Sequence, residues 1–170
     1  MFNITRAEIH GVILEYPSNK YWGEYLVLQK DAEVKKYLGT PWSEEECKNA
    51  RKWPDPPIAN DQLLLIIDSC THAFLGYCGA MRFDGGESSG EDRWEIYCVM
   101  VKSAWGKGNG SKIVDFLESS LKAEGKIPVA VVDSKNERSI RMLRKKGWQL
   151  TGILNKEDSW QNGNLLFTPS

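Results

Sequence analysis

The chain has 170 residues, which suits one domain of ordinary size that buries a core of its own. Its 22 Lys and Arg residues nearly balance 23 Asp and Glu residues, whereas a dedicated nucleic-acid binder carries a strong basic excess. Four cysteines without a Cys-x-x-Cys pair, only two histidines, and no apolar run near the roughly 18 residues that span a membrane predict a cytoplasmic protein with free thiols, no metal and no membrane partner.

The first third of the chain is expected to fold into one strand followed by helices. The apolar spacing predicts a strand over 10–16 and helices over 19–29, 31–38 and 44–53. Asp31 is placed to cap the second helix, and Ser43 with Glu46 forms a capping box for the third. The proline-rich run over 53–61 predicts a loop.

Beyond residue 61 the pattern changes to strands, and then to strands that alternate with helices. The expected strands are short apolar runs at 62–69, 72–83, 93–101, 127–133, 148–154 and 163–168. Amphipathic helices are expected over 109–124 and from a capping box at Ser134 and Glu137 to about residue 146, whereas 84–92 reads as a loop. This order predicts a single α/β (α+β) domain, with a mixed central sheet of about six to seven strands flanked by helices.

The segment most informative about function lies between a predicted strand and a predicted helix. It contains Gly106, Gly108 and Gly110, whose backbone N–H groups can approach a ligand closely. A helix N-terminus adds unpaired donors and partial positive charge, so the pattern is typical of a phosphate site. The spacing fits neither the P-loop nor the Rossmann fingerprint, whose last glycine would fall on Ser111. The alternative is a strand–helix turn that needs glycine for its backbone alone.

This segment and the strand–helix unit after it resemble the GCN5-related N-acetyltransferase (GNAT) superfamily. The family's signature, Gln/Arg-x-x-Gly-x-Gly/Ala, reads here Trp105-Gly106-Lys107-Gly108-Asn109-Gly110, so a tryptophan stands in the first position. The next family motif reads here Asn136, Ser139, Gly147 and Trp148. The first third is similar to the RimJ/RimL-like branch of ribosomal-protein N-terminal acetyltransferases, and the resemblance covers roughly 10 to 155.

The resemblance implies which residues hold acetyl-CoA. The glycine loop would bind the pyrophosphate, Asn136 would contact pantetheine, and a backbone N–H near Met100 would polarise the thioester carbonyl. The cofactor-binding residues implied in this way are Val99, Met100, Val101, Trp105, Gly106, Lys107, Gly108, Asn109, Gly110, Ser111 and Asn136. The acetyl-CoA half would span about 93–154, and acceptor-side elements would lie at about 17–60 and 84–92.

The resemblance also suggests catalytic residues. Glu95 is the candidate general base, because some family members carry a glutamate in a strand of similar sequence. The alternative is that Glu95 is an ordinary strand carboxylate. Ser139, or a water held by Tyr97, is the candidate general acid, because the tyrosine that serves many members is Leu143 here. The alternative for Ser139 is a local backbone cap. Cys98 is expected to be a buried small hydrophobe rather than a nucleophile.

The leading hypothesis is an N-acetyltransferase that moves the acetyl group of acetyl-CoA directly to a primary amine. The acceptor is left open among a protein N-terminus, an aminoglycoside-like drug, a polyamine and a free amino acid. An alternative is a GNAT-fold acyl-CoA sensor or interaction module without turnover. Glu87, Glu91 and Asp92 would attract a cationic amine, although loose surface acids explain that loop equally well. An exposed strand near the C-terminus is compatible with a homodimer.

Overall fold

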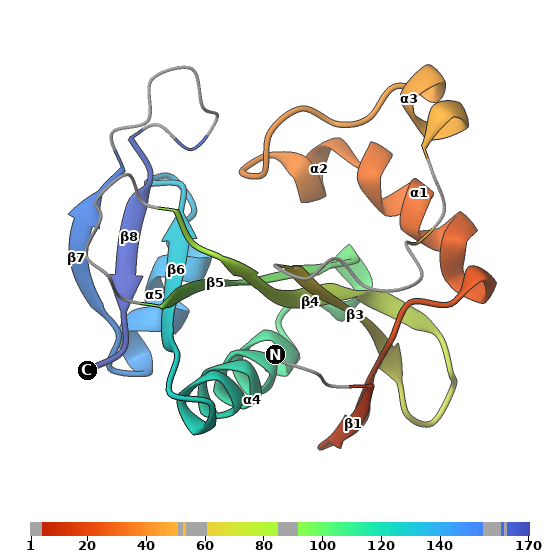
Figure 1. Ribbon diagram of the computed structural model, residues 1–170. Helices are drawn as coiled ribbons and strands as arrows, with labels where there is room; N and C mark the ends of the chain where they lie inside the picture. The colour runs from red at the N-terminus through yellow and green to blue at the C-terminus, as the bar shows by residue number, and fades with distance from the viewer. Residues whose placement is uncertain (1–4, 51–52, 54–60, 85–91, 155–160, 162) are drawn as a thin grey trace.

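Eight strands form one mixed sheet in the order β1-β2-β3-β4-β5-β6-β8-β7 (Figure 1). The computed structural model describes residues 5–50, 53, 61–84, 92–154, 161 and 163–170. The strands are β1 (Arg6–Ile9), β2 (Val12–Glu15), β3 (Asp61–Asp68), β4 (Phe74–Arg82), β5 (Arg93–Met100), β6 (Ile127–Val132), β7 (Gln149–Ile153) and β8 (Leu165–Thr168). Neighbouring strands pair antiparallel, except β5 and β6, which run parallel.

The helices cover both faces of this sheet (Figure 1). They are α1 (Trp22–Lys30), α2 (Ala32–Lys35), α3 (Glu44–Asn49), α4 (Asn109–Ala123) and α5 (Glu137–Lys145), with 3-10 turns η1 (Asn19–Tyr21) and η2 (Lys102–Ala104). The first three lie on one side and the last two on the other (Figure 1). The predicted α/β class, with a mixed sheet between helices, is therefore confirmed.

Two of the three predicted helix caps are present. Asp31 Oδ1 accepts the N–H groups of Glu33 and Val34 at the start of α2. Ser43 and Glu46 form the reciprocal capping box of α3. Both caps satisfy N–H groups that a helix start leaves without an acceptor.

The predicted capping box at Ser134 is wrong. α5 is capped instead by Asn136, whose side chain accepts the N–H of Ser139. The Asn136 N–H donates to Asp133 O, so the chain first makes a turn after β6 and only then enters the helix. Ser134 lies within this turn, two residues too early to serve as a cap.

The predicted strand over 10–16 is present as β2, and an additional strand, β1, precedes it and pairs with it in a hairpin, which brings the count above the expected six to seven strands. His10 and Gly11 form its two-residue turn, with φ of 42° and 93°. Positive φ at both central positions matches the twist of the flanking strands, so this turn closes a tight hairpin. The apolar pattern around His10 does not reveal the turn, because histidine is not a typical residue for it.

Parallel strands β5 and β6 pair over only three residues and then diverge. The register joins 93–95 to 127–129, whereas from Ala130 on β6 pairs with β8. The second half of β5, residues 96–100, is thus paired with β4 on one edge and has no β6 partner on the other. This opening between two strands positions the candidate site.

Side chains of β5 alternate between the two cores on opposite faces of the sheet. Trp94 and Ile96 pack in the core beneath α4 and α5, whereas Val99 packs in the core beneath α1 and α2. By the same alternation, Glu95 and Tyr97 project to the α1 and α2 side. The strand therefore sends its carboxylate to the face that the early helices cover.

Tyr97 depends on a glycine in the neighbouring strand. A Cβ at Gly79 would stand 1.8 Å from Gln62 O and 2.6 Å from the Tyr97 hydroxyl oxygen. We expect Gly79→Ala to lower the free energy of unfolding by about 3 kcal/mol or more, because the nearest obstacle is backbone. Gly152→Ala in β7 is the matched control, since its Cβ would meet only Leu166 side-chain carbons at 3.9 Å or more. Denaturant unfolding of both variants checks this, and equal midpoints would contradict it.

Candidate functional site

A cavity of about 490 Å³ opens where β5 and β6 diverge. Its lining brings together Glu95, Cys98 and Val99 from β5 with Asn136 and Ser139 from the start of α5. These residues come from segments more than 30 positions apart, and the splayed strands place them around one space. Four of the sequence-predicted site residues, all but Cys98 in this group, are therefore neighbours in the fold.

The backbone of β5 directs specific donors into this opening. Arg93 O accepts from Phe83 N–H, and Val101 N–H donates to Leu75 O. The backbone N–H and C=O groups of odd-numbered residues in β5 therefore point toward β4. The polar groups of Cys98 and Met100 must then point away from β4, toward the gap. The N–H of Val101 is already bonded to Leu75 O within the sheet. The N–H of Val99 also points toward β4, because backbone groups alternate in direction along a strand. Of Val99, Met100 and Val101, only Met100 turns its N–H toward the unpaired edge of β5.

The glycine loop lies between the end of β5 and the start of α4. Gly106 and Gly108 are exposed and have φ of 75° and 79°, a conformation that favours glycine. Gly108 is the N-cap of α4 and supplies no side-chain acceptor, so the first N–H groups of this 15-residue helix, among them those of Asn109 and Ser111, point to solvent. Backbone donors at such a helix start can receive an anion. Lys107 is exposed beside it.

The third glycine of the loop has a different role. A Cβ at Gly110 would come within 3.3 Å of Met100 Cε and 3.8 Å of Met142 Sδ. Its lack of a side chain lets the start of α4 approach β5 and α5 closely. This glycine brings the helix N-terminus near the open end of the gap.

Trp105, which replaces the polar residue of the family signature, turns back on β5. Its Nε1–H donates to Met100 O at 2.8 Å. The guanidinium carbon of Arg138, in α5, lies 4.0 Å from the centre of the Trp105 ring, within cation–π distance. The tryptophan therefore ties the loop to β5 and holds an arginine from α5 at the loop. Sequence spacing gave no signal for this pair, which is 33 residues apart.

Glu95 is buried in the cavity wall, with a relative exposure of 9%. Gln161 Nε2 stands 3.3 Å from one carboxylate oxygen and 3.4 Å from the other. This amide donates to the carboxylate and orients it. Sequence reasoning did not identify Gln161, because 66 positions separate it from Glu95.

Asn136 caps α5, whereas the side chain of Ser139 lines the cavity. Asn136 Oδ1 accepts the Ser139 N–H at 3.3 Å and so caps α5. The Ser139 hydroxyl lines the cavity and makes no hydrogen bond among the residues that the structure describes. The alternative that this hydroxyl caps the backbone is therefore not what the geometry shows. Leu143, one turn further on, is 2% exposed and packs in the core.

Tyrosines form the wall of the cavity on the α1 and α2 side. Tyr97 donates its hydroxyl proton toward Asp61 Oδ1 at 2.9 Å and lies 3.2 Å from Gln62 O. Burial raises the pKa of Tyr97 well above its ordinary value, so it stays a phenol. Tyr77, whose ring contacts that of Tyr97, accepts a hydrogen bond from Gln29 Nε2 at 3.1 Å. Sequence analysis did not identify Asp61 or Tyr77 as parts of the site.

The acids of the loop before β5 can be placed only in part. Asp92 Oδ1 accepts the indole N–H of Trp94 at 2.8 Å. Glu87 and Glu91 lie outside the described residues. Asp92 thus has a structural partner and need not be held for an incoming amine.

Cys98 lies in the cavity wall, and burial raises the pKa of its thiol to about 12. At pH 7 about one molecule in 10⁵ then carries a thiolate there, too few for an acetyl-enzyme pathway. We expect Cys98→Ala to keep kcat within about two-fold. Iodoacetamide should label the exposed Cys70 first, and Cys70→Ser should remove that fast phase. A mass increase of one acetyl group on Cys98 after mixing with acetyl-CoA would contradict this.

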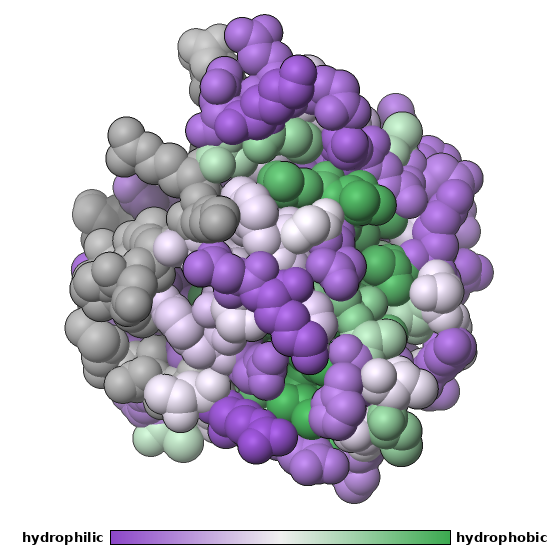
Figure 2. All heavy atoms as spheres, turned by 90° about the vertical axis from the view of Figure 1, so that its right-hand side faces the viewer, coloured by the Kyte–Doolittle hydropathy of each residue, from purple (hydrophilic) through white to green (hydrophobic). Residues whose placement is uncertain are grey.

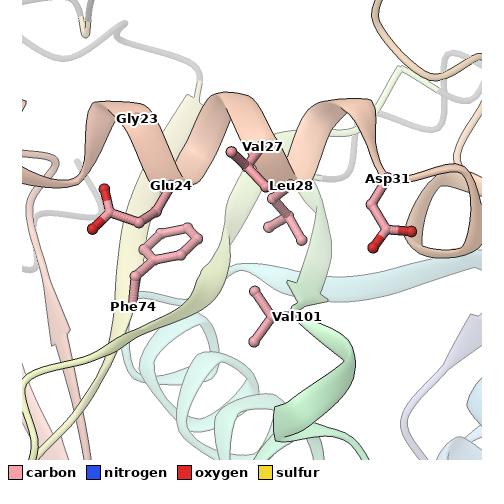
Figure 3. A pocket seen from close by; sticks show the side chains of 7 residues that line it. All are labelled: Gly23, Glu24, Val27, Leu28, Asp31, Phe74 and Val101. Atoms are coloured by element: carbon pink, nitrogen blue, oxygen red, sulfur yellow. The ribbon is translucent and has the colours of Figure 1, made fainter.

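A second hollow, of about 530 Å³, lies between α1 and the ends of β4 and β5 (Figure 3). Its walls are mostly apolar, and Figure 3 shows Leu28, Phe74 and Val101 pointing into it. Asp31 at its rim already caps α2. The side of the molecule that bears α1 and β4 shows apolar residues at the surface, ringed by polar ones (Figure 2). Of the predicted site residues, only Val101 reaches this hollow, so it is separate from the candidate site.

No group of three His, Cys, Asp or Glu side chains in the part of the chain that the structure describes is placed to hold a metal ion. None of the helices described is both long and apolar enough to cross a bilayer.

The fold joins a splayed pair of parallel strands through a glycine loop and the helix that begins at it. Residues 12–149 match the family described as the acetyltransferase (GNAT) domain, so the chain belongs to the GNAT acetyltransferases. The family suggests that the protein is an acetyl-CoA-dependent acetyltransferase.

Solved structures share the fold at low sequence identity. A GNAT-family acetyltransferase from Bacillus anthracis is 16% identical, with a TM-score of 0.73 over 95% of each chain. An acetyltransferase from Agrobacterium tumefaciens is 14% identical, with a TM-score of 0.74 over 98% of this chain and 95% of that one. A spermidine N-acetyltransferase from Vibrio cholerae, solved with CoA and spermine, is 12% identical, with a TM-score of 0.69 over 92% of each chain. No curated protein matches the sequence.

Proposed function

We propose that this protein transfers the acetyl group of acetyl-CoA directly to a primary amine. The observation that carries the proposal is the cavity between β5 and β6, which Glu95 and Ser139 line, beside the unpaired edge of β5 to which the Met100 N–H points. A carboxylate, a hydroxyl and a backbone donor around one space are what amine acetylation requires. The RimJ/RimL-like branch is the part of the family in which we place the chain.

The glycine loop is the proposed site of the CoA pyrophosphate. Gly106 and Gly108 expose their backbone, and the uncapped start of α4 adds N–H donors and partial positive charge. Arg138, held over Trp105, adds a cation beside the loop. This cation offsets the loss of the Gln or Arg side chain that the family signature carries. Asn136 remains the proposed pantetheine contact, through its Nδ2 group, because Oδ1 is used as the helix cap.

The division of the domain follows from this placement. We assign acetyl-CoA binding to residues about 93–154 and the acceptor side to about 17–60 and 84–92. The pantetheine arm would run along the unpaired edge of β5, where Met100 offers its N–H to the thioester oxygen. The side chain of Glu95 projects to the face of the sheet that α1 and α2 cover, opposite the face that α4 and α5 cover. The amine would therefore approach from the side of the early helices.

The proposed reaction has one bond formed and one broken at the acetyl carbon. Glu95 accepts a proton from the amine, whose nitrogen then attacks the thioester carbonyl. The Met100 N–H stabilises negative charge on the carbonyl oxygen in the tetrahedral state. When the carbon–sulfur bond breaks, the Ser139 hydroxyl passes a proton to the departing thiolate and takes up the proton that the substrate nitrogen loses as it becomes an amide. Tyr97 does not fill this role, because its proton is engaged by Asp61 and burial raises its pKa.

Calorimetry with CoA and acetyl-CoA, beside a thiol-release assay over an amine panel, tests the proposal. The panel contains Ser- and Ala-starting peptides, aminoglycosides, polyamines and amino acids. We expect micromolar binding and thiol release with one acceptor class. Binding without release on any class would favour an acyl-CoA sensor, and failure to bind either ligand near millimolar concentration would contradict both functions.

A further inference from the structure

The acceptor side of the cavity contains a buried cation. Lys35, the last residue of α2, lines the cavity with a relative exposure of 9%. Its Nζ donates to Gln29 Oε1 at 3.2 Å, a neutral acceptor. Among the residues that the structure describes, no carboxylate forms an ion pair with it. Burial lowers the pKa of Lys35, and no neighbouring charge counters that effect.

A buried ammonium group without a counter-charge is costly, and proteins usually pair it or leave it in water. The carboxylate of Asp61 lines the same cavity but accepts a hydrogen bond from Tyr97 instead. The neighbouring Lys36 is exposed, so an outward position is available to lysine in this segment. Lys35 is therefore buried in the cavity wall at an energetic cost, and no opposite charge among the described residues offsets that cost.

The contacts around Lys35 hold its position. Gln29 is itself 3% exposed, and its amide bridges the Lys35 ammonium group to the Tyr77 hydroxyl. The Tyr77 ring packs between those of Tyr25 and Tyr97. The cation is thus held by a buried amide, which is itself bonded to a tyrosine that packs between two others. A fixed charge on an apolar wall selects a ligand group of opposite charge.

We propose that Lys35 binds an anionic group of the acceptor, so that the substrate is an amine that also carries a carboxylate or a phosphate-like group. This rests on the proposed function and deepens it. The anion would pair with Lys35 while the amine reaches Glu95, which lines the same cavity. The acceptor would then be an amino acid, an acidic peptide or an amino phosphonate, and polyamines would be poor substrates. The 12% identity to a spermidine N-acetyltransferase gives no reason to expect its acceptor here.

The test compares acceptors that differ only in charge. ω-Amino carboxylates of increasing length and the corresponding amino phosphonates are each measured beside a neutral partner, the carboxamide or the phosphonate diester. Binding to the CoA-loaded protein is followed by calorimetry, and transfer by thiol release. We expect wild type to prefer one anionic series, and Lys35→Met to lower kcat/KM for that series by about 100-fold with little change for its neutral partners.

Three further variants and readouts separate the possible outcomes. Lys35→Arg should restore part of the preference because it keeps the charge, and Lys36→Met should behave as wild type. The Kd for CoA should be unchanged in Lys35→Met, which excludes a general defect of the cavity. If neutral amines are acetylated as well as anionic ones, or Lys35→Met binds both series as wild type does, this proposal is wrong and the transferase proposal stands. Failure of wild type to bind CoA would instead overturn the transferase proposal itself.

Discussion

Glu95→Gln is expected to lower kcat/KM for acetyl transfer by about 100- to 1,000-fold, because the substitution removes the group that accepts the amine proton. Glutamine has nearly the same shape, and Gln161 can still hydrogen-bond to its carbonyl oxygen. The Kd for CoA should therefore stay within about two-fold, since the carboxylate faces the acceptor side of β5. Steady-state thiol release and calorimetry on the same preparation measure both quantities.

Glu8→Gln is the matched control, because Glu8 is an exposed carboxylate in β1, far from β5 in the sheet. It should leave kcat/KM unchanged. The pH profile adds a readout that a structural role would not move: the acidic limb of wild type should flatten in Glu95→Gln. Unchanged kcat/KM in this variant would mean that Glu95 is an ordinary strand carboxylate.

Gly108→Val is expected to weaken binding of CoA and acetyl-CoA by about 100-fold or more. At φ of 79° a β-branched residue is strained, and its side chain would project into the loop that is proposed to receive the pyrophosphate. No heavy atom lies within 4 Å of the Cβ position, so the protein itself offers no steric reason for a large folding defect. Calorimetry with CoA measures the loss.

Gly125→Val provides a control with the same backbone strain. Gly125 has φ of 71°, also has open space around its Cβ position, and follows the opposite end of α4. Both variants should lose a similar amount of stability, but only Gly108→Val should lose CoA affinity. Equal CoA affinity in the two variants would show that the loop does not bind the cofactor.

Local sequence patterns predicted much of the fold. Asp31 and Ser43 cap helices as expected, because a cap is a contact within a few residues. Ser134 failed as a cap because the chain needs a turn after β6, and Asn136 takes the role. The hairpin turn at His10 was missed because its first central position has a positive φ without being a glycine, which is uncommon.

The candidate site divides in the same way. The glycine loop and Asn136 are contiguous motifs, so the sequence alone could locate them. Contacts between distant segments could not be found, such as the amide of Gln29 on the Tyr77 hydroxyl, 48 positions away. Lys35 belongs to this second group, since only the packed structure shows that one lysine of a charged helix is buried.

Hydrogen exchange with and without CoA tests most directly whether the cofactor lies in the opening between β5 and β6. The central claim predicts slower exchange at the N–H of Met100 and across the glycine loop, 106–111, when CoA is present. Residues of the separate hollow, such as Val27 and Leu28, should not change. Protection confined to that hollow, or no protection at Met100 and the loop under saturating CoA, would contradict the assignment of the site.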